Sequence, residues 1–180
     1  GSGQGGEDNA LEEVLYEGYG PHGIAILVQV LTDNRMRTVA EVRHLFTRYG
    51  GNLSAANSVA WMFARKGYLA VNPGDADPDE IGLLAIEAGA EDVETSASLV
   101  ELYTAVEDFA AVREALAGAK YELSSAQLSW IPQSPTGLGE EAALKAMKLI
   151  ELLEDLDDVQ EVYSNLDIQD ELIAKYEAAA

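Results

Sequence analysis

The chain has 180 residues, of which 48% are apolar, and its formal net charge is −21. These values exclude a disordered acidic chain and predict one large or two small folded domains. No apolar run reaches the roughly 18 residues that cross a bilayer, no signal peptide is recognisable, and the absence of cysteine excludes disulfide bonds and thiolate metal sites.

The beginning of the chain predicts two strands joined by a turn. Residues 1–10 are rich in glycine, and we expect them to be a disordered lead-in or a tag remnant. Residues 11–20 predict a short strand, and residues 24–32, nearly all apolar, predict a strand that is buried on both faces. The intervening GPHG predicts a turn, because Pro21 fixes φ and the flanking glycines permit tight geometry.

A helix is expected next. Thr38 and Glu41 have the spacing of a capping box, and Gly50 is a typical helix stop. Apolar residues recur at helical spacing on one face of this segment, at Val39, Val42, Phe46 and Tyr49. On the predicted helix, Arg37, His44 and Arg48 lie roughly opposite that face, with Arg43 toward a flank.

Residues 58–71 predict a hairpin whose turn is Lys66 and Gly67. Arg65 and Lys66 would then lie at its tip. Trp61 alternates with apolar neighbours, and Trp130 occupies a similar position in a later strand. We therefore expect both tryptophans to pack in the core, in preference to stacking on bases.

Two linkers rich in helix- and strand-breaking residues, 72–80 and 132–139, bracket a compact α/β segment. Its expected elements, in order, are a helix at 79–90, strands at 91–95 and 98–104, a helix at 106–119 and a strand at 121–131. DADPDE, within the first linker, contains a helix cap at Asp77 followed by Pro78. It does not fit a calcium loop, because Ile86 stands where a bidentate glutamate is required.

The last elements expected are a helix at 140–156 and a strand at 158–168. Joined to the strand, helix and hairpin before the first linker, they give βαββαβ, the order of a ferredoxin-like sandwich. We therefore predict an α+β fold of two ferredoxin-like α/β sandwich domains, the second inserted into the first. The predicted ranges are 11–74 plus 134–168 for the first domain, 75–133 for the inserted domain and 169–180 for a C-terminal tail.

Positive charge is concentrated between residues 35 and 66. This window holds 6 of the 11 lysines and arginines and a single acid, Glu41, so its net charge is +5 against −26 elsewhere. Local charge can outweigh net charge, since screening acts over about 8 Å at physiological salt. The candidate nucleic-acid-binding residues are Arg35, Arg37, Arg43, His44, Arg48, Arg65 and Lys66. Arginine suits phosphate contact; the alternative is that these side chains pair with the protein's own surplus carboxylates.

Other kinds of site receive little support from the sequence. A phosphate loop needs a helix after GPHG, and a strand is expected there. His22 and His44 are the only histidines, and without cysteine a structural zinc site is not expected. The common catalytic and nucleotide-binding motifs are missing. We expect no cofactor, no bound metal and no enzymatic activity.

Several segments carry a family resemblance: YEGYGPHGIAILV, LTDNRMRTVAEVRHLF, GGNL, SVAWMF, EAGAEDVE, WIPQ and LEDLDDVQEVYSN. From about Tyr16 to Ile168 the chain resembles the YebC/PmpR family, which includes the mitochondrial translational activators of cytochrome oxidase. The resemblance implies a helical N-terminal domain, absent from this sequence and a natural partner of it, followed by two α/β domains. The family turn is commonly GPGG, whereas His22 replaces a glycine here.

The resemblance implies a regulator of gene expression, either a DNA-binding transcription factor or a ribosome-associated translation factor. We expect a cytoplasmic protein without a membrane partner that contacts DNA or ribosomal RNA through backbone or shape, not base sequence. The alternative is a ligand-sensing or protein-interaction module that uses a cleft between the two domains.

Overall fold

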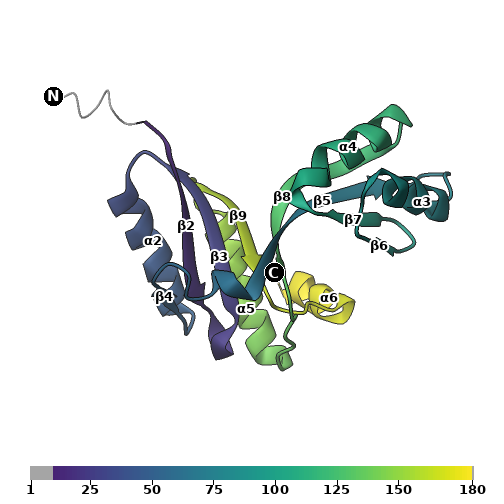
Figure 1. The fold of residues 1–180 in the computed structure, drawn as a ribbon. Helices are drawn as coiled ribbons and strands as arrows, with labels where there is room; N and C mark the ends of the chain where they lie inside the picture. Colours follow the sequence, from purple (N-terminus) through teal and green to yellow (C-terminus); the bar gives the residue numbers. More distant parts are fainter. Residues whose placement is uncertain (1–9, 180) are drawn as a thin grey trace. The chain divides into compact units, whose positions relative to one another are not determined.

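The computed structural model describes residues 10–179, and its contacts divide the chain into two units. Unit 1 runs up to Phe63 and resumes at Pro132, and unit 2 comprises Ala64–Ile131. Each unit is a four-stranded antiparallel sheet with helices (Figure 1). The predicted fold class, α+β with two sandwich domains, is confirmed. The predicted lead-in, apart from Ala10, lies outside the described residues.

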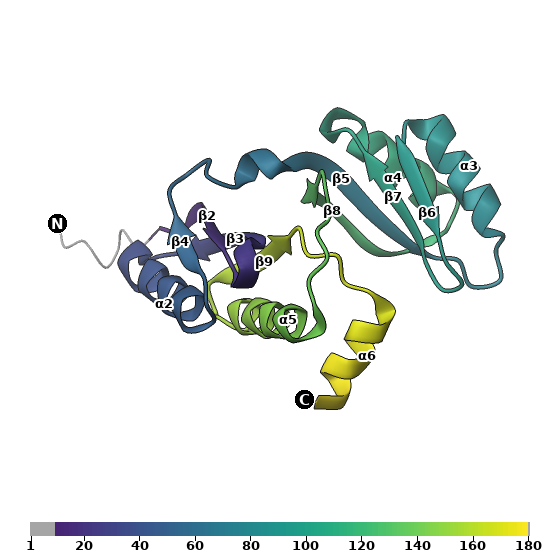
Figure 2. The same ribbon diagram turned by 90° about the horizontal axis from the view of Figure 1, so that it is seen from below.

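Unit 1 builds its sheet from a hairpin to which two further strands are added. Its elements are β2 (Glu12–Tyr19), the 3₁₀ turn η1 (Pro21–Gly23), β3 (Ala25–Thr32), α2 (Arg35–Arg48), β4 (Asn52–Ser54), the 3₁₀ turn η2 (Ala60–Met62), α5 (Glu140–Glu154), β9 (Val159–Ser164) and α6 (Asp170–Ala179). The strand order is β4-β2-β3-β9. Helices α2 and α5 lie side by side on one face of this sheet (Figure 2).

The core of unit 1 fills the space between the sheet and these two helices. Its buried residues come from alternate positions before and in β3 and from the apolar stripes of α2 and α5: Ile24, Ile26, Val28, Val30, Val42, Phe46, Ala143, Ala146, Leu149 and Leu153. Ala25 and Leu27, which point to the other face of the sheet, are also fully buried. The prediction of a strand buried on both faces is confirmed.

The element order βαββαβ that we predicted for the first domain is wrong there, since unit 1 has the order ββαβαβ, and it is found in unit 2 instead. Its elements are β5 (Phe63–Asn72), α3 (Pro78–Ala88), β6 (Asp92–Thr95), β7 (Val100–Thr104), the 3₁₀ turn η3 (Val106–Asp108), α4 (Phe109–Gly118) and β8 (Glu122–Pro132). The sheet order β6-β7-β5-β8 with βαββαβ connections is ferredoxin-like. Asp77 caps α3 by accepting from the Asp79 N–H at 2.9 Å, as predicted.

The predicted hairpin at 58–71 is wrong. Ala60–Met62 form a 3₁₀ turn, and β5 is one continuous strand that passes through Arg65 and Lys66. The alternation of apolar residues before Phe63 does not form a strand, because the Glu17 carboxylate holds the backbone N–H groups of this segment in a turn. Unit 2 consequently begins at Ala64, whereas we placed the start of the inserted domain at residue 75.

Two further differences concern the start of α2 and the predicted C-terminal tail. Helix α2 begins at Arg35, and its N-cap is Asn34, whose side-chain oxygen accepts from the Arg37 N–H; the cap expected at Thr38 is wrong. Thr38 is a residue of α2 itself. Its side chain is fully buried, and its hydroxyl forms hydrogen bonds with the side chains of Thr32 and Asp158. The segment expected as a C-terminal tail contains α6, and Leu172 packs on the core of unit 1.

Candidate nucleic-acid interface

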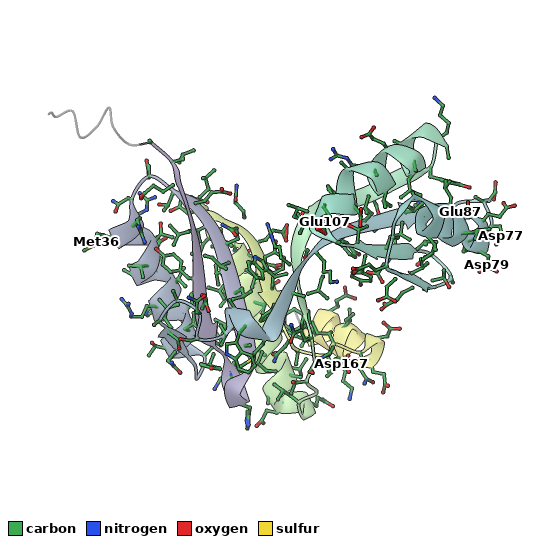
Figure 3. All side chains as sticks on the ribbon, viewed as in Figure 1. Met36, Asp77, Asp79, Glu87, Glu107 and Asp167 are labelled. Carbon is green, nitrogen blue, oxygen red and sulfur yellow. The ribbon has the colours of Figure 1, made fainter. Side chains whose placement is uncertain are left out.

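Helix α2 carries most of the predicted basic residues. It holds four arginines against one acid, Glu41, and it is the only helix with a net positive charge in the part of the chain that the structure describes. Its buried face, Thr38, Val42 and Phe46, fixes which side chains point away from the sheet. Met36, at the outer side of α2, is 81% exposed (Figure 3).

Arg37 is paired within the protein. Its guanidinium donates to the Asp158 carboxylate at 2.7 Å and to the Asp33 carboxylate at 3.1 Å. These bonds, that to Asp158 first, raise the pKa of Arg37 above its usual value. For this residue the alternative of pairing with the protein's own acids is the better description, although its side chain remains 45% exposed.

Asp158 gathers three donors at the junction of α2 and the turn before β9. Besides Arg37, it accepts from the hydroxyl of Thr38 at 2.7 Å and from that of Thr32 at 3.3 Å. The bonds from Arg37 and Thr38 lower the pKa of Asp158. The start of α2 is thereby fixed to the end of α5 and the start of β9, which gives Arg37 a structural role.

The other basic residues of α2 are exposed and lack carboxylate partners. Within residues 10–179 no ion pair involves Arg35, Arg43, His44 or Arg48. The Arg48 guanidinium lies 5.7 Å from the ring centroid of Tyr49, which is a cation–π contact that leaves its donors available. Since successive helix residues turn by about 100°, Arg43 and the pair His44 and Arg48 flank a strip of surface along α2.

The environment of α2 differs along its length. Near its start, a cavity of about 620 Å³ is lined by carboxylates of Asp33, Glu41, Asp155, Asp157 and Asp158, together with Arg37. Arg43, His44 and Arg48 belong to the later part of the helix and do not line this cavity. The positive potential is therefore expected to be strongest toward the C-terminal half of α2.

Arg65 and Lys66 belong to unit 2 and are already engaged there. The Arg65 guanidinium lies 5.2 Å from the ring centroid of Trp130. The Lys66 ammonium donates to the Glu91 carboxylate at 2.5 Å. Their proximity to α2 in sequence does not make them part of the same element, because β5 carries both into the other sheet.

A lysine that the sequence reasoning missed lies near the end of α2. Lys145 of α5 lines a cavity of about 260 Å³ together with His22 of η1 and Gly50, two residues after Arg48. A Cβ built on Gly50 would stand 3.2 Å from the Lys145 ammonium nitrogen. Lys145 is about 100 residues from α2 in the sequence, so only the pairing of α2 with α5 could have shown this neighbour.

GPHG forms the turn that we predicted, and no helix follows it. Residues Pro21–Gly23 make η1, with His22 at a φ of 55° and Gly23 at 77°, and β3 begins directly afterwards. In the described residues no group of three or more histidine, cysteine or carboxylate side chains is placed to hold a metal. Nor does any helix in that part of the chain have the length and apolar character needed to cross a membrane.

Trp61 does not pack in the core, contrary to our prediction. Its side chain is 66% exposed, and its indole N–H donates to the Ser58 carbonyl oxygen at 2.9 Å. The Glu17 carboxylate, only 4% exposed, accepts hydrogen bonds from the backbone of the turn that carries Trp61. Trp130 is half-buried and is covered by Arg65.

The Glu17 carboxylate accepts the backbone hydrogen bonds of the segment after β4, which has no neighbouring strand in the described residues to accept them. It accepts from the backbone N–H groups of Asn57 at 2.7 Å, Val59 at 3.0 Å and Ala60 at 2.8 Å. Three charge-assisted hydrogen bonds compensate the burial of one carboxylate. The connection from β4 to β5 is fixed in this way by one side chain of β2.

Comparison with known proteins identifies the family. A family profile described as "TACO1/YebC second and third domain" matches residues 11–166. The chain is 49% identical over 174 residues to the "Probable transcriptional regulatory protein YebC" of Shigella flexneri and to a probable transcriptional regulatory protein of Enterobacter sp. (strain 638). Each match covers 96% of this chain and 70% of the relative.

A solved structure is similar as well. The crystal structure of a conserved hypothetical protein from Aquifex aeolicus matches with a TM-score of 0.83 and 44% identity, covering 89% of this chain and 66% of that one. The chain thus spans about two thirds of that relative's length. The resemblance inferred from the sequence is confirmed, and the chain belongs to the TACO1/YebC family.

Proposed function

We propose that this chain is a non-enzymatic regulator of gene expression that contacts nucleic-acid phosphates through the C-terminal half of α2. The contacting side chains are Arg43, His44 and Arg48, with Arg35 at the start of the helix as a further contact. The observation that carries the proposal concerns four basic residues of α2 on a molecule whose net charge is −21. Within residues 10–179, Arg35, Arg43, His44 and Arg48 are exposed and form no ion pair. The names of the curated relatives, probable transcriptional regulatory proteins, support the regulatory role.

The chemistry of these side chains favours contact with the phosphate backbone. Guanidinium groups bind phosphate oxygens in bidentate fashion, and such contacts position a protein without reading sequence. The acidic remainder of the molecule repels polyanions that do not engage α2. A ribonucleoprotein such as the ribosome offers protein contacts in addition to phosphates, so it suits this charge distribution better than bare duplex DNA does.

Arg37, Arg65 and Lys66 have a smaller place in this proposal than the sequence suggested. Each is already paired with a carboxylate or an aromatic ring. A phosphate would have to displace the carboxylate partners of Arg37 and Lys66, which reduces the net gain of contact. Arg65 has a cation–π contact alone, but it belongs to unit 2 and not to α2. Lys145 is added as a candidate contact, since it lies beside Gly50 at the end of α2.

The test is binding of the whole chain to duplex DNA, to structured ribosomal RNA and to ribosomes over a series of salt concentrations. Phosphate contacts release counterions, so the logarithm of the binding constant should fall linearly with the logarithm of salt, by about 0.9 per contact on duplex DNA. Tighter binding to RNA or ribosomes than to DNA at equal salt would favour a translation factor, and the reverse a transcription factor. Binding that does not respond to salt would contradict the proposal.

The alternative from the sequence, a ligand-sensing or protein-interaction module, stays a prediction, as does the cytoplasmic location. Protein interaction is favoured by one specific feature of unit 2, a groove that Leu83 and Ile86 of α3 line beside the edge strand β6. A charge reversal at Arg43 and Arg48 separates the two hypotheses. If partner binding survives the reversal unchanged, nucleic-acid contact through α2 is wrong.

A further inference from the structure

Unit 2 exposes an apolar strip between α3 and the edge strand β6. Leu83 and Ile86, one helical turn apart on α3, are 61% and 46% exposed. They line a groove of about 450 Å³ whose other wall includes Asp92, Val93 and Thr95 of β6. Two large aliphatic side chains exposed side by side are unusual on a helix that otherwise packs its apolar residues inward.

Strand β6 forms one edge of its sheet. In the order β6-β7-β5-β8 it pairs only with β7, along Asp92–Thr95. Its other side presents backbone N–H and C=O groups that the sheet does not use. An open edge beside an apolar groove is the geometry in which an extended peptide adds a strand and places alternate side chains in pockets.

The two faces of β6 differ in chemistry. Val93 packs toward α3 and the core of unit 2, whereas Asp92 and Glu94 point to the opposite face of the sheet. On that face Glu94 lies directly opposite Glu101 of β7. Like charges at directly opposed positions destabilise a sheet. An added strand with a cation next to Glu94 would relieve this repulsion.

The surroundings reinforce the negative charge. Asp79 of α3 lines the groove, and Asp77 and Glu87 lie at the start of α3 and along it (Figure 3). Glu91 also lines the groove, with its carboxylate paired to Lys66. Burial and, after it, the carboxylates of Glu101, Glu94 and Asp92 raise the pKa of Tyr103 to about 12. Residues 64–131 contain 13 acidic against 4 basic side chains.

We propose that this groove binds an extended segment of another protein in which lysine or arginine alternates with aliphatic residues, and that the segment adds a strand to β6. Its aliphatic side chains would lie on Leu83, Ile86 and Val93, and its cations beside Asp92 and Glu94. A second copy of this chain does not fit, because its own β6 would bring Asp92 and Glu94 against the same carboxylates. Nucleic acid is excluded by the same charges.

The proposal is independent of nucleic-acid contact by α2, which belongs to unit 1. The two can therefore fail separately. If the chain binds the peptide but not nucleic acid, the function proposed above is wrong and the peptide proposal stands. If it binds nucleic acid but not the peptide, the peptide proposal is wrong and the function proposed above stands.

The experiment uses the whole chain and a fluorescein-labelled octapeptide of alternating lysine and valine, with blocked ends. Binding is followed by fluorescence anisotropy, and the site by NMR shifts of the amides of α3 and β6. The variant Leu83→Ser/Ile86→Ser should weaken binding about tenfold or more. Glu94→Lys should do the same without touching an apolar residue, which keeps the test valid if the double variant folds poorly.

Matched controls lie in the same unit. Val106→Ser removes an exposed aliphatic side chain outside the groove, and Glu122→Lys reverses an exposed charge on β8; both should bind the peptide as the wild type does. A peptide with glutamate in place of lysine, and one with alternate backbone amides methylated, should not bind.

Several outcomes overturn the proposal. These are no binding of the lysine–valine peptide up to about 1 mM, equal binding of the glutamate peptide, equal binding by wild type and Glu94→Lys, or shifts confined to other elements. Sedimentation equilibrium without peptide tests whether a second copy of this chain occupies the groove. A dimer that dissociates on Leu83→Ser/Ile86→Ser would show that a second copy fills the groove, and the partner named here would be wrong.

Discussion

At the scale of single residues, Asp158 and Glu17 show how carboxylates on an acidic chain become structural. Asp158 joins Arg37, Thr38 and Thr32 at one point. Glu17 joins three backbone N–H groups at another. Neither role is visible in the sequence, because the donors of Asp158 are about 120 residues away and those of Glu17 about 40.

Asp158→Asn should destabilise the fold by about 1–2 kcal/mol at neutral pH, as expected for a hydrogen-bonded carboxylate near the surface. The pKa of Asp158 is lowered in the folded protein below its ordinary value of 3.8. Its stabilising contribution is therefore present above about pH 4 and is lost as the pH falls through the folded-state pKa. Urea unfolding of both proteins from pH 7 to pH 3 should show the difference shrinking in acid.

The matched control for this prediction is Asp157→Asn, a change at the exposed neighbouring carboxylate. It should leave stability nearly unchanged across the same pH range. Equal losses from the two substitutions would show that Asp158 has no special role in fixing the start of α2.

Glu17→Ala should cost about 2–4 kcal/mol, because it leaves three backbone donors without their acceptor, among them the buried N–H of Val59. Hydrogen exchange at Asn57, Val59 and Ala60 should accelerate more than exchange in α2. Glu13→Ala, at an exposed position of the same strand, serves as the control. Unchanged exchange at these amides would contradict the role assigned to Glu17.

At the scale of elements, local signals predicted what local forces decide. The strand β3 and the Asp77–Pro78 start of α3 were correctly predicted, since an unbroken apolar run and a helix cap can both be recognised in the local sequence. The segment before Phe63 was not, because its alternating pattern fits a strand and only Glu17 of β2 makes it turn. Helix α6 was missed: none of its residues is fully buried, and only the tertiary fold shows that Leu172 packs on the unit 1 core.

The start of α2 gives a prediction at this scale. Asn34→Ala removes the side-chain acceptor of the Arg37 N–H and should destabilise the protein by about 1 kcal/mol. Asn34→Asp keeps the acceptor and should retain stability. Thermal unfolding of the two variants checks this, and equal melting temperatures for Asn34→Ala and wild type would show that capping begins elsewhere.

At the scale of the whole molecule, the positive charge of the basic window is divided between the two units. The basic window of the sequence does not correspond to one surface element: Arg35 to Arg48 form part of α2, whereas β5 takes Arg65 and Lys66 into unit 2. Sequence reasoning could predict the basic helix, because its periodicity is local. It left open whether Arg37 pairs with the protein's own carboxylates, and it could not predict that Lys145 lies near Gly50 or that a groove opens beside β6.

The most direct test of the account compares the variant Arg43→Glu/Arg48→Glu with the matched variant Arg113→Glu/Lys120→Glu, which changes the charge of unit 2 by the same amount. The binding constant for structured ribosomal RNA is measured for both and for the wild type over a salt series. We predict that the first variant loses most of its affinity and that its salt slope falls by about 2, whereas the second retains the wild-type slope. Equal slopes for the two variants would contradict phosphate contact through α2.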